Sequence, residues 1–326
     1  MREISINEIE NIGIGQCENS EAGTGCTAIV STDKIRGGMK AGVDVRGGGP
    51  ASRDTQLLNP LMAAERIHAI LLSGGSAFGL GAANGVMKYL EERDFGYDVG
   101  VTKVPLVIQS DIFDLTVGDV YTRPDPDMAY EAAKKAVEEP NYKDGNYGAG
   151  CGATVGKIAG MATCMKTGIG SYAIELEGLK IGAVVVLNAL GDIFDPETGH
   201  QIAGLLSEDK KTLLNTIEFM KNNLKPTENK FTGNTTLATV ITNADFSKAE
   251  LCKIAGMAHD GYARSIRPVH TTADGDSIYA VSVGDVKADM DLVGTLAAEV
   301  VSKAIVRAVE SAQSAYGYLA ARDIFE

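Results

Sequence analysis

The pattern of apolar and polar residues predicts a protein in which strands and helices alternate along the chain. Short apolar or β-branched runs are typical of strands, and they occur at residues 24–30, 41–45, 68–72, 171–176, 181–187 and 235–244. A basic turn joins the first two runs. The run at 181–187 is almost wholly apolar, which indicates a central strand, and Glu177-Gly178 joins it to its neighbour as a hairpin.

Longer segments with apolar residues at helical spacing predict helices at 77–93, 128–139, 202–223, 245–264 and 287–316. Asp245 or Ser247 is a suitable N-cap for the fourth of them. The glycines between Gly79 and Gly85 miss the GxGxxG spacing and lie inside a helical pattern, so a dinucleotide site is not expected. Together the elements predict an α/β protein whose last helix covers a sheet.

The sharpest change of pattern falls at Asn234-Thr235. Residues 225–233 are polar and contain Pro226 and Gly233, so they predict an exposed connection, whereas a β-branched strand begins at or near Thr235. A hydroxyl therefore stands at the head of a strand, behind a loop that could be cut without dismantling the core. A protein that makes its own N-terminal nucleophile needs this arrangement. An ordinary strand start fits the same residues, and Asn234-Thr235-Thr236 would be a glycosylation site in a secreted chain.

Composition narrows the classes of function. The 326 residues are 44% hydrophobic and 22% charged, which is ordinary for a globular protein with a sizeable core. The net charge of -13 argues against nucleic acid as a partner, because no basic stripe is present to neutralise phosphates. The charged N-terminus does not have the pattern of a signal peptide and no apolar run reaches membrane-spanning length, so we expect a cytoplasmic protein without membrane contact.

Cysteine and histidine spacing bears on metals and disulfides. Five scattered cysteines include no CxxC pair, and four histidines show neither HxxxH nor HExxH spacing. We therefore expect no disulfide framework, no metal and no cofactor.

Two segments before the Thr235 strand carry candidate chemistry. Residues 145–157 form a glycine-dense loop whose amides could hold an anion or an oxyanion, and Lys157 at its end is either a surface residue or a catalytic one. Asn188 follows the buried strand, where its amide must find partners. It is either a loop organiser or an oxyanion donor.

Asp274-Gly275-Asp276 leads into a further strand as a tight turn, which is typical of a hairpin. If that strand adjoins the strand of Thr235, the two carboxylates can orient the amine of the nucleophile or hold a substrate ammonium. A calcium loop is not expected, because the further oxygen ligands at alternate positions are missing.

Seven blocks, in order along nearly the whole chain, resemble the signature blocks of the DmpA-like family. That family comprises the L-aminopeptidase/D-esterases, the β-aminopeptidases and the nylon-oligomer hydrolases. The blocks are residues 24–27, 46–50, 72–80, 148–157, 188–192, 234–237 and 274–276. The resemblance implies a single four-layer αββα sandwich domain over residues 1–326. It also implies a precursor that cleaves itself into an α chain, 1–234, and a β chain, 235–326.

The resemblance assigns roles to five residues: Thr235 is the expected nucleophile, Lys157 and Asn188 are its neighbours, and Asp274 and Asp276 are the acids of the site. The freed amine of the β chain would act as general base, with its proton affinity lowered by Lys157, and Asn188 would donate to the oxyanion. The implied substrate is a small peptide or amide with a free amine, and the implied assembly is a homotetramer of αβ units.

Threonine at the nucleophile position, and Asp-Gly-Asp where the serine aminopeptidases have Ser and Glu, look more like the nylon-oligomer hydrolases. Two rivals remain at this stage: an acyltransferase of the N-acetylornithine type, and a homologue of the same fold that is never processed. The glycine-rich blocks fit the acyltransferases poorly, and a non-catalytic scaffold needs none of the five residues. We therefore expect a self-processing amidohydrolase, either an aminopeptidase or an oligomer hydrolase.

Overall fold

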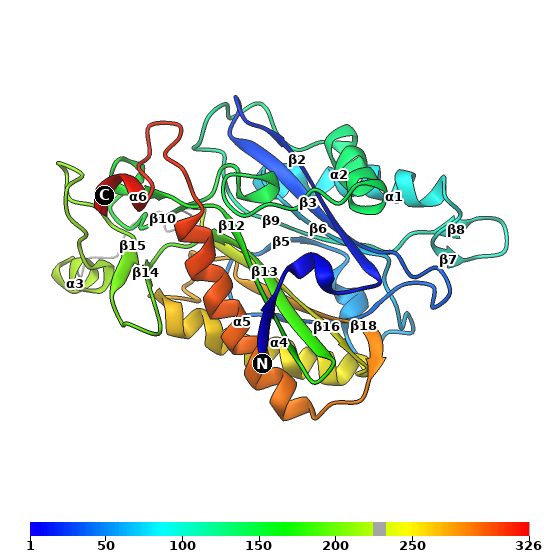
Figure 1. Ribbon diagram of the computed structural model, residues 1–326. Coiled ribbons are helices and arrows are strands. Elements are labelled where there is room, and N and C mark those ends of the chain that lie inside the picture. Colours follow the sequence, from blue (N-terminus) through cyan, green and yellow to red (C-terminus); the bar gives the residue numbers. More distant parts are fainter. Residues whose placement is uncertain (224–232, 326) are drawn as a thin grey trace.

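Two β-sheets stacked face to face form the centre of the protein, which a computed structural model describes for residues 1–223 and 233–325 (Figure 1). The first sheet has five strands in the order β2-β3-β6-β9-β5. Its strands are β2 (Ile12–Asn19), β3 (Thr24–Ser31), β5 (Ala51–Arg53), β6 (Ala69–Ser73) and β9 (Val107–Asp111). β6 and β9 pair in parallel, and the other described neighbours in this sheet are antiparallel.

The second sheet has six strands in the order β1-β12-β13-β16-β18-β4. Its strands are β1 (Arg2–Ile4), β4 (Lys40–Val45), β12 (Ile169–Leu176), β13 (Leu179–Asn188), β16 (Thr235–Ala244) and β18 (Ser277–Val286). β16 and β18 pair in parallel, while the other described pairs are antiparallel. A parallel pair needs a crossover connection, which α4 (Lys248–Ser265) supplies. The strand predicted from Thr235 onwards is confirmed and lies inside this sheet.

Helices cover the outer faces of both sheets, so the layers follow one another as α, β, β and α (Figure 1). α1 (Ala83–Glu91) and α2 (Pro126–Glu138) lie on the first sheet, and α4 and α5 (Met290–Glu310) lie on the second. This is the predicted αββα sandwich. Short helical elements border the layers: η1 (Ile6–Glu8), η2 (Thr55–Leu58), η3 (Ser76–Gly81), η4 (Gly148–Gly150), η5 (Met161–Thr163), α3 (Thr216–Asn222) and α6 (Arg322–Phe325). Short strands do the same: β7 (Tyr97–Asp98), β8 (Lys103–Val104), β10 (Thr154–Val155), β11 (Met165–Lys166), β14 (Asp192–Phe194), β15 (Gln201–Ala203) and β17 (Ile266–Arg267).

Apolar side chains fill the spaces between the layers, and β13 contributes to two of them. Val184 and Val186 pack into the cluster between the two sheets, whereas Val185 and Leu187 pack into the cluster under α4 and α5. Successive side chains of a strand point to opposite faces, so a strand between two apolar layers must be apolar throughout. The prediction of a central strand from this run is confirmed.

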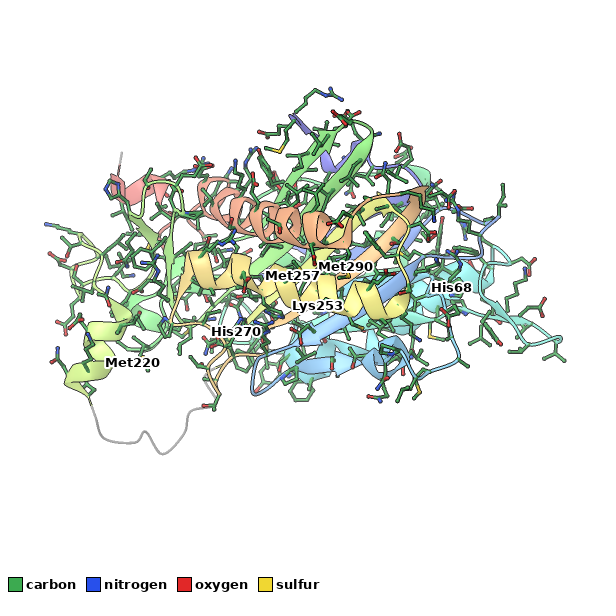
Figure 2. The ribbon with its side chains drawn as sticks, turned by 90° about the horizontal axis from the view of Figure 1, so that it is seen from below. His68, Met220, Lys253, Met257, His270 and Met290 are labelled. Atoms are coloured by element: carbon green, nitrogen blue, oxygen red, sulfur yellow. The ribbon has the colours of Figure 1, made fainter. Side chains whose placement is uncertain are left out.

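α4 and α5 pack side by side over the second sheet, with Met257 on α4 and Met290 at the start of α5 (Figure 2). Gly261 permits this close approach, because a Cβ there would lie 2.5 Å from the carbonyl oxygen of Ala298. Ser247 is the N-cap of α4 and accepts a hydrogen bond from the N–H of Glu250. Of the two predicted caps, Ser247 is therefore the one that the helix uses.

The prediction of a helix over residues 202–223 is wrong for most of that range. β15 opens the segment, and only α3 is helical. The carboxylate of Asp192 accepts hydrogen bonds from the N–H of Leu205 and from the N–H and hydroxyl of Thr216. Tertiary hydrogen bonds of this kind hold an irregular segment in place, and local spacing does not reveal them.

Two other predicted features differ from the structure, and a third lies mostly outside the described residues. β3 and β4 are both present, but they belong to different sheets although a short basic turn joins them. The helix predicted from residue 77 begins as the 3-10 turn η3, and α1 starts at Ala83. Of the connection predicted over 225–233, residues 225–232 lie outside the described residues. Within residues 1–223 and 233–325, no helix is long and apolar enough to cross a membrane.

Candidate active site

Neighbouring strands of the second sheet bring the five predicted site residues to one end of β16. Thr235, the first residue of β16, pairs with Asn188, the last residue of β13. On the other side, the parallel register of β16 with β18 places Asp274 beside Asn234 as an isolated bridge. The condition that the strands of Thr235 and of the two acids must adjoin is therefore met.

The Thr235 side chain lies against the peptide bond that precedes it. Thr235 is only 4% exposed, and its Oγ1 donates a hydrogen bond of 2.5 Å to the carbonyl oxygen of Asn234. The same carbonyl oxygen accepts a 2.8 Å hydrogen bond from the backbone N–H of Gly275. A hydroxyl and a polarised carbonyl thus lie next to each other in a buried position.

Lys157 is buried beside this peptide bond, with 3% of its surface exposed. Its Nζ donates to the side-chain oxygen of Asn188 at 2.8 Å, to the backbone oxygen of Asn188 at 3.1 Å and to the carbonyl oxygen of Gly233 at 3.3 Å. Burial disfavours the charged form and lowers the pKa of Lys157 to about 7, although the negative charges of Asp274 and Asp276 oppose the shift. The amine can therefore exchange a proton near neutral pH.

Asn188 uses its amide to connect three segments. Its Oδ1 accepts from Lys157 and from the N–H of Thr154, and its Nδ2 donates to the carbonyl oxygens of Phe113 at 3.2 Å and Gly233 at 3.4 Å. Asn188 is therefore a loop organiser in the uncut chain. The oxyanion role expected for it would require Nδ2 to leave the carbonyl oxygen of Gly233.

Asp274 is tied to the loop that precedes β18. Its carboxylate accepts from the N–H and hydroxyl of Thr271 and, at 3.3 Å, from the N–H of Leu190. Burial and the nearby charge of Asp276 raise the pKa of Asp274 to about 6. The nearby charge of Asp276 thus disfavours ionisation of Asp274, as close like charges do.

Asp276 connects Thr236, the residue after Thr235, to a histidine. Its Oδ1 accepts from the N–H of Thr236 at 2.8 Å, and its Oδ2 accepts from the N–H of His270 at 3.1 Å and lies 2.9 Å from the Nδ1 of the same residue. The sequence reasoning did not single out His270. Its signal was weak, namely a histidine close before an Asp-Gly turn, and His270 also adopts a positive φ of 57°.

A cavity of about 30 Å³ opens beside Thr235. Its lining comprises Gly49, Ala51, Ser76, Asp111, Phe113, Gly233, Asn234, Thr235, Thr272 and Ala273. Asp111 is 1% exposed, and its Oδ1 accepts from the side chain of Gln109 at 2.7 Å. Its Oδ2 has no hydrogen-bond partner among residues 1–223 and 233–325, and burial raises the pKa of Asp111 well above its usual range. Sequence reasoning missed this carboxyl and also did not predict the strand β9 that Asp111 ends.

The glycine-dense loop does not have the open amides that its sequence predicted. The N–H of Gly148 donates to Glu18, that of Ala149 to Thr27, and that of Thr154 to Asn188. Lys166 lies buried under the loop and donates to the carbonyl oxygens of Gly150 and Ala153. The loop is a packed support for Lys157 and Asn188, because tertiary partners occupy its amides.

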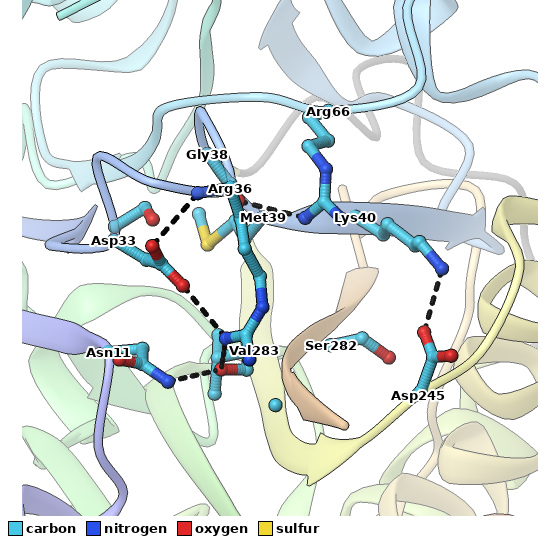
Figure 3. Close-up of a pocket in the computed structure, with 12 residues that line it drawn as sticks. Asn11, Asp33, Arg36, Gly38, Met39, Lys40, Arg66, Asp245, Ser282 and Val283 are labelled. Atoms are coloured by element: carbon cyan, nitrogen blue, oxygen red, sulfur yellow. Dashed lines mark hydrogen bonds and ion pairs between the residues drawn. The ribbon is translucent and has the colours of Figure 1, made fainter. Parts of the chain in front are cut away.

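A second polar pocket lies at the other end of β16, beyond Ala244 (Figure 3). Four of its charged residues form ion pairs, Arg36 with Asp33 and Lys40 with Asp245 at 2.7 Å, and Arg66 donates to the carbonyl oxygen of Gly38. Its volume is only about 10 Å³. Among the described residues, no group of three His, Cys, Asp or Glu side chains is placed to hold a metal ion. The cluster around Thr235 is therefore the stronger candidate for chemistry.

Known proteins are similar to this chain over most of its length. The profile of peptidase family S58 matches residues 5–322. An uncharacterized aminopeptidase of Mycobacterium leprae (strain TN) is 34% identical over 339 residues, which cover 96% of this chain and 92% of that protein. A 6-aminohexanoate-oligomer endohydrolase of Kocuria sp. (strain KY2) is 31% identical over 285 residues, covering 86% of this chain and 75% of that protein.

Among solved structures, the L-aminopeptidase D-Ala-esterase/amidase of Ochrobactrum anthropi, described as a variant of the Ntn hydrolase fold, superposes with a TM-score of 0.70. It shares 17% identity and covers 94% of this chain and 86% of that chain. The fold is therefore that of the N-terminal nucleophile hydrolases. The chain belongs to peptidase family S58. It is an amidohydrolase, as its resemblance to the DmpA-like family implied.

Proposed function

We propose that the protein cleaves its own chain between Asn234 and Thr235 and then hydrolyses amide bonds with Thr235 as an N-terminal nucleophile. The observation that carries this proposal is the position of Thr235 Oγ1, 2.5 Å from the carbonyl oxygen of Asn234 at the buried head of β16. A hydroxyl held there is adjacent to the carbonyl carbon that it must attack.

Self-cleavage would begin as an N-to-O acyl shift. Oγ1 of Thr235 bonds to the carbonyl carbon of Asn234, the peptide C–N bond breaks, and the hydroxyl proton is delivered to the leaving nitrogen. Water then hydrolyses the ester, which leaves an α chain of residues 1–234 and a β chain of residues 235–326. Because the reacting groups belong to adjacent residues, no loss of translational freedom opposes the attack.

Lys157 is the group best suited to carry the proton in this step, because the nitrogen of Thr235 is still an amide and cannot act as a base. The Nζ of Lys157 binds the carbonyl oxygen of Gly233, one residue before the scissile bond. With a pKa of about 7, a substantial share of Lys157 is neutral at neutral pH.

After cleavage, the new α-amine of Thr235 takes over as general base, since such amines titrate near about 7.7 to 8.0. Protonated Lys157 lowers the proton affinity of this amine, and Asp274 and Asp276 hold it in position. Departure of Gly233 releases the Nδ2 of Asn188, which can then donate to the substrate carbonyl. Such a donor is typically worth about 3 kcal/mol of the barrier.

We infer the substrate class from Asp111, a buried residue in the lining of the cavity. Asp111 Oδ2 is buried and has no partner among the described residues, so it is suited to bind a cation that enters with the substrate. An aminoacyl group and a 6-aminohexanoyl group both carry a primary amine. The names of the relatives in Mycobacterium and Kocuria fit such acyl groups. We therefore propose amides whose acyl part bears a primary ammonium group.

Mass spectrometry of freshly purified protein tests the proposal. We expect the intact mass to be replaced by two chains that divide at Asn234-Thr235, while Thr235→Ala stays uncut and inactive. Activity would be measured on p-nitroanilides of α- and β-amino acids and on a linear 6-aminohexanoate oligomer. Full activity in a protein that remains a single chain would contradict the proposal. The homotetramer of αβ units and the cytoplasmic location stay predictions, and light scattering would test the first.

A further inference from the structure

We infer that the backbone N–H of Gly275 is an oxyanion donor of this enzyme, first for the carbonyl of Asn234 during self-cleavage and then for the carbonyl of the substrate. The inference rests on the proposed function and deepens it. It assigns a catalytic contact to a backbone group, which side-chain reasoning from the sequence does not find.

The N–H of Gly275 points at the oxygen on which negative charge would develop. It lies 2.8 Å from the carbonyl oxygen of Asn234, within the range required of an oxyanion donor. The contact continues the parallel pairing of β16 with β18, which joins Leu237 to Ser277 and then Asn234 to Asp274. The two strands therefore hold the donor in place before any reaction starts.

A second observation places Gly275 against the nucleophile itself. A Cβ at Gly275 would lie 2.6 Å from Thr235 Oγ1 and 2.9 Å from the carbonyl oxygen of Gly49. The absence of a side chain therefore leaves the space that the hydroxyl occupies. Gly275 contacts the oxygen that attacks and the oxygen that receives the charge.

The same donor serves the substrate because the two reactions share their reacting atoms. In self-cleavage Oγ1 forms a bond with the carbonyl carbon of Asn234, and in turnover it forms a bond with the acyl carbon of the substrate. Each attack moves an electron pair onto the carbonyl oxygen, and each ends in an ester of Thr235. Once Asn234 has left, the N–H of Gly275 lacks this acceptor, so a substrate carbonyl that takes the place of Asn234 completes the same contact.

The test replaces one backbone N–H group by an oxygen atom and leaves every side chain unchanged. Suppression of a stop codon with tRNA carrying glycolic acid replaces the Gly275 amide by an ester, which has no N–H. The matched control is glycolic acid at Gly85, a buried glycine of α1 on the outer face of the first sheet, whose N–H donates to the carbonyl oxygen of Ala82 at 2.9 Å. Both chains lose one buried hydrogen bond, and circular dichroism compares their folds.

We expect self-cleavage of the Gly275 ester chain to slow about 10²- to 10³-fold, which is the usual effect of losing one oxyanion donor. Once the chain is processed, its kcat should fall to a similar extent. The Gly85 ester should cleave at the rate of the unmodified protein. Equal cleavage rates for the two ester chains would overturn the inference while leaving the proposed function intact. Failure of the unmodified chain to cleave would instead contradict the proposed function.

Hydrogen exchange supplies a readout that does not depend on the folding of an ester chain. With ¹⁵N-glycine labelling, the Gly275 amide should exchange slowly in uncut Thr235→Ala, where Asn234 accepts its proton. It should exchange at least tenfold faster in the processed enzyme, where the acceptor has left. Equal protection in both forms would mean that the N–H is bound elsewhere in the mature site, and the inference would be wrong.

Discussion

The Nζ of Lys157 lies 2.8 Å from Oδ1 of Asn188, and both side chains also contact the carbonyl oxygen of Gly233. A buried amine and a buried amide thus both donate to the carbonyl oxygen of Gly233, one residue before the proposed scissile bond. The amide carries no charge. It therefore accepts a hydrogen bond from Lys157 without raising the pKa of Lys157 as a carboxylate would. This explains why a lysine with an obvious partner still has a pKa of about 7.

Replacement of the neutral partner by a charged one tests this relationship. In Asn188→Asp a carboxylate would face Nζ, so the pKa of Lys157 should rise by at least one unit and less of the amine should be neutral at pH 7. The rate of self-cleavage should therefore increase with pH up to about 7 in the natural protein and up to a higher pH in the variant. The pH profile of cleavage, followed on denaturing gels, measures the shift. An unshifted acid limb would show that Lys157 is not the base.

Lys157→Met and Lys166→Met form a matched pair of variants. Burial lowers the pKa of both lysines to about 7, but Lys166 binds carbonyl oxygens of the glycine-dense loop. Lys157→Met should fold and cleave at least about 10²-fold more slowly, as expected for loss of a general base. Lys166→Met should still cleave but melt at a lower temperature, because buried carbonyl oxygens lose their donor. Similar cleavage rates in the two variants would contradict the role given to Lys157.

The same two lysines predict how stability depends on pH. Between about pH 7 and 10 an unfolded lysine is protonated whereas each folded one is neutral, so the unfolded state binds more protons. The free energy of unfolding should therefore rise with pH in this window, by about 1.4 kcal/mol per pH unit for each lysine. Urea unfolding at several pH values measures how the free energy of unfolding changes with pH. In each Met variant this slope should be smaller by the contribution of the lysine that was replaced.

Asp276→Asn should slow cleavage because an amide cannot accept at both ends. One of the contacts to Thr236 and His270 must be lost, which loosens the backbone next to Thr235, the proposed nucleophile. We expect cleavage to slow at least tenfold and the free energy of unfolding to fall by about 1.5 to 3 kcal/mol. The control is Asp192→Asn, another buried carboxylate with several donors, which lies beside Leu205 and Thr216. It should lose similar stability but keep the cleavage rate of the folded protein.

Asp111→Asn tests the proposed amine subsite. An ammonium group bound beside Asp111 favours the ionised carboxylate. Loss of that charge should raise KM for an aminoacyl p-nitroanilide by roughly 10- to 100-fold, in line with about 1.5 to 3 kcal/mol for a charge-assisted hydrogen bond. Turnover of the matching N-acetylated substrate should not change, because that substrate has no ammonium group. Asp114→Asn is the control, since both oxygens of Asp114 already bind Thr24 and Gly75. An equal rise in KM for both substrates would argue against the subsite.

The positions of Thr235 and Asn188 could be predicted because neighbouring residues in the sequence indicate where each strand begins or ends. Thr235 stands at an abrupt change from polar to β-branched sequence, and the structure starts β16 at that residue. Asn188 ends an apolar run, and the structure ends β13 there. In both cases the strand boundary follows from local pattern, so the position of the side chain at the end of the sheet follows as well.

Other parts of the site depend on contacts between distant segments. Asp111 and His270 have no local pattern that separates them from other polar residues. The stacking of two sheets nevertheless brings Asp111 to the cavity beside Thr235, and the fold brings His270 to Asp276. The glycine-dense loop misled in the opposite direction. Its composition predicted free amides. In the folded protein the N–H groups of Gly148, Ala149 and Thr154 instead donate to side chains of β2, β3 and β13.

The amino-acid sequence by itself determined which segments became central strands and outer helices, because alternation and helical spacing state which faces must be buried. It also determined that a hydroxyl heads the strand at residue 235. Tertiary structure alone decided the register that sets the Gly275 amide on the carbonyl oxygen of Asn234 and buries Lys157 against Asn188. Such contacts join residues tens of positions apart, and their geometry depends on how whole layers pack, which no local period encodes.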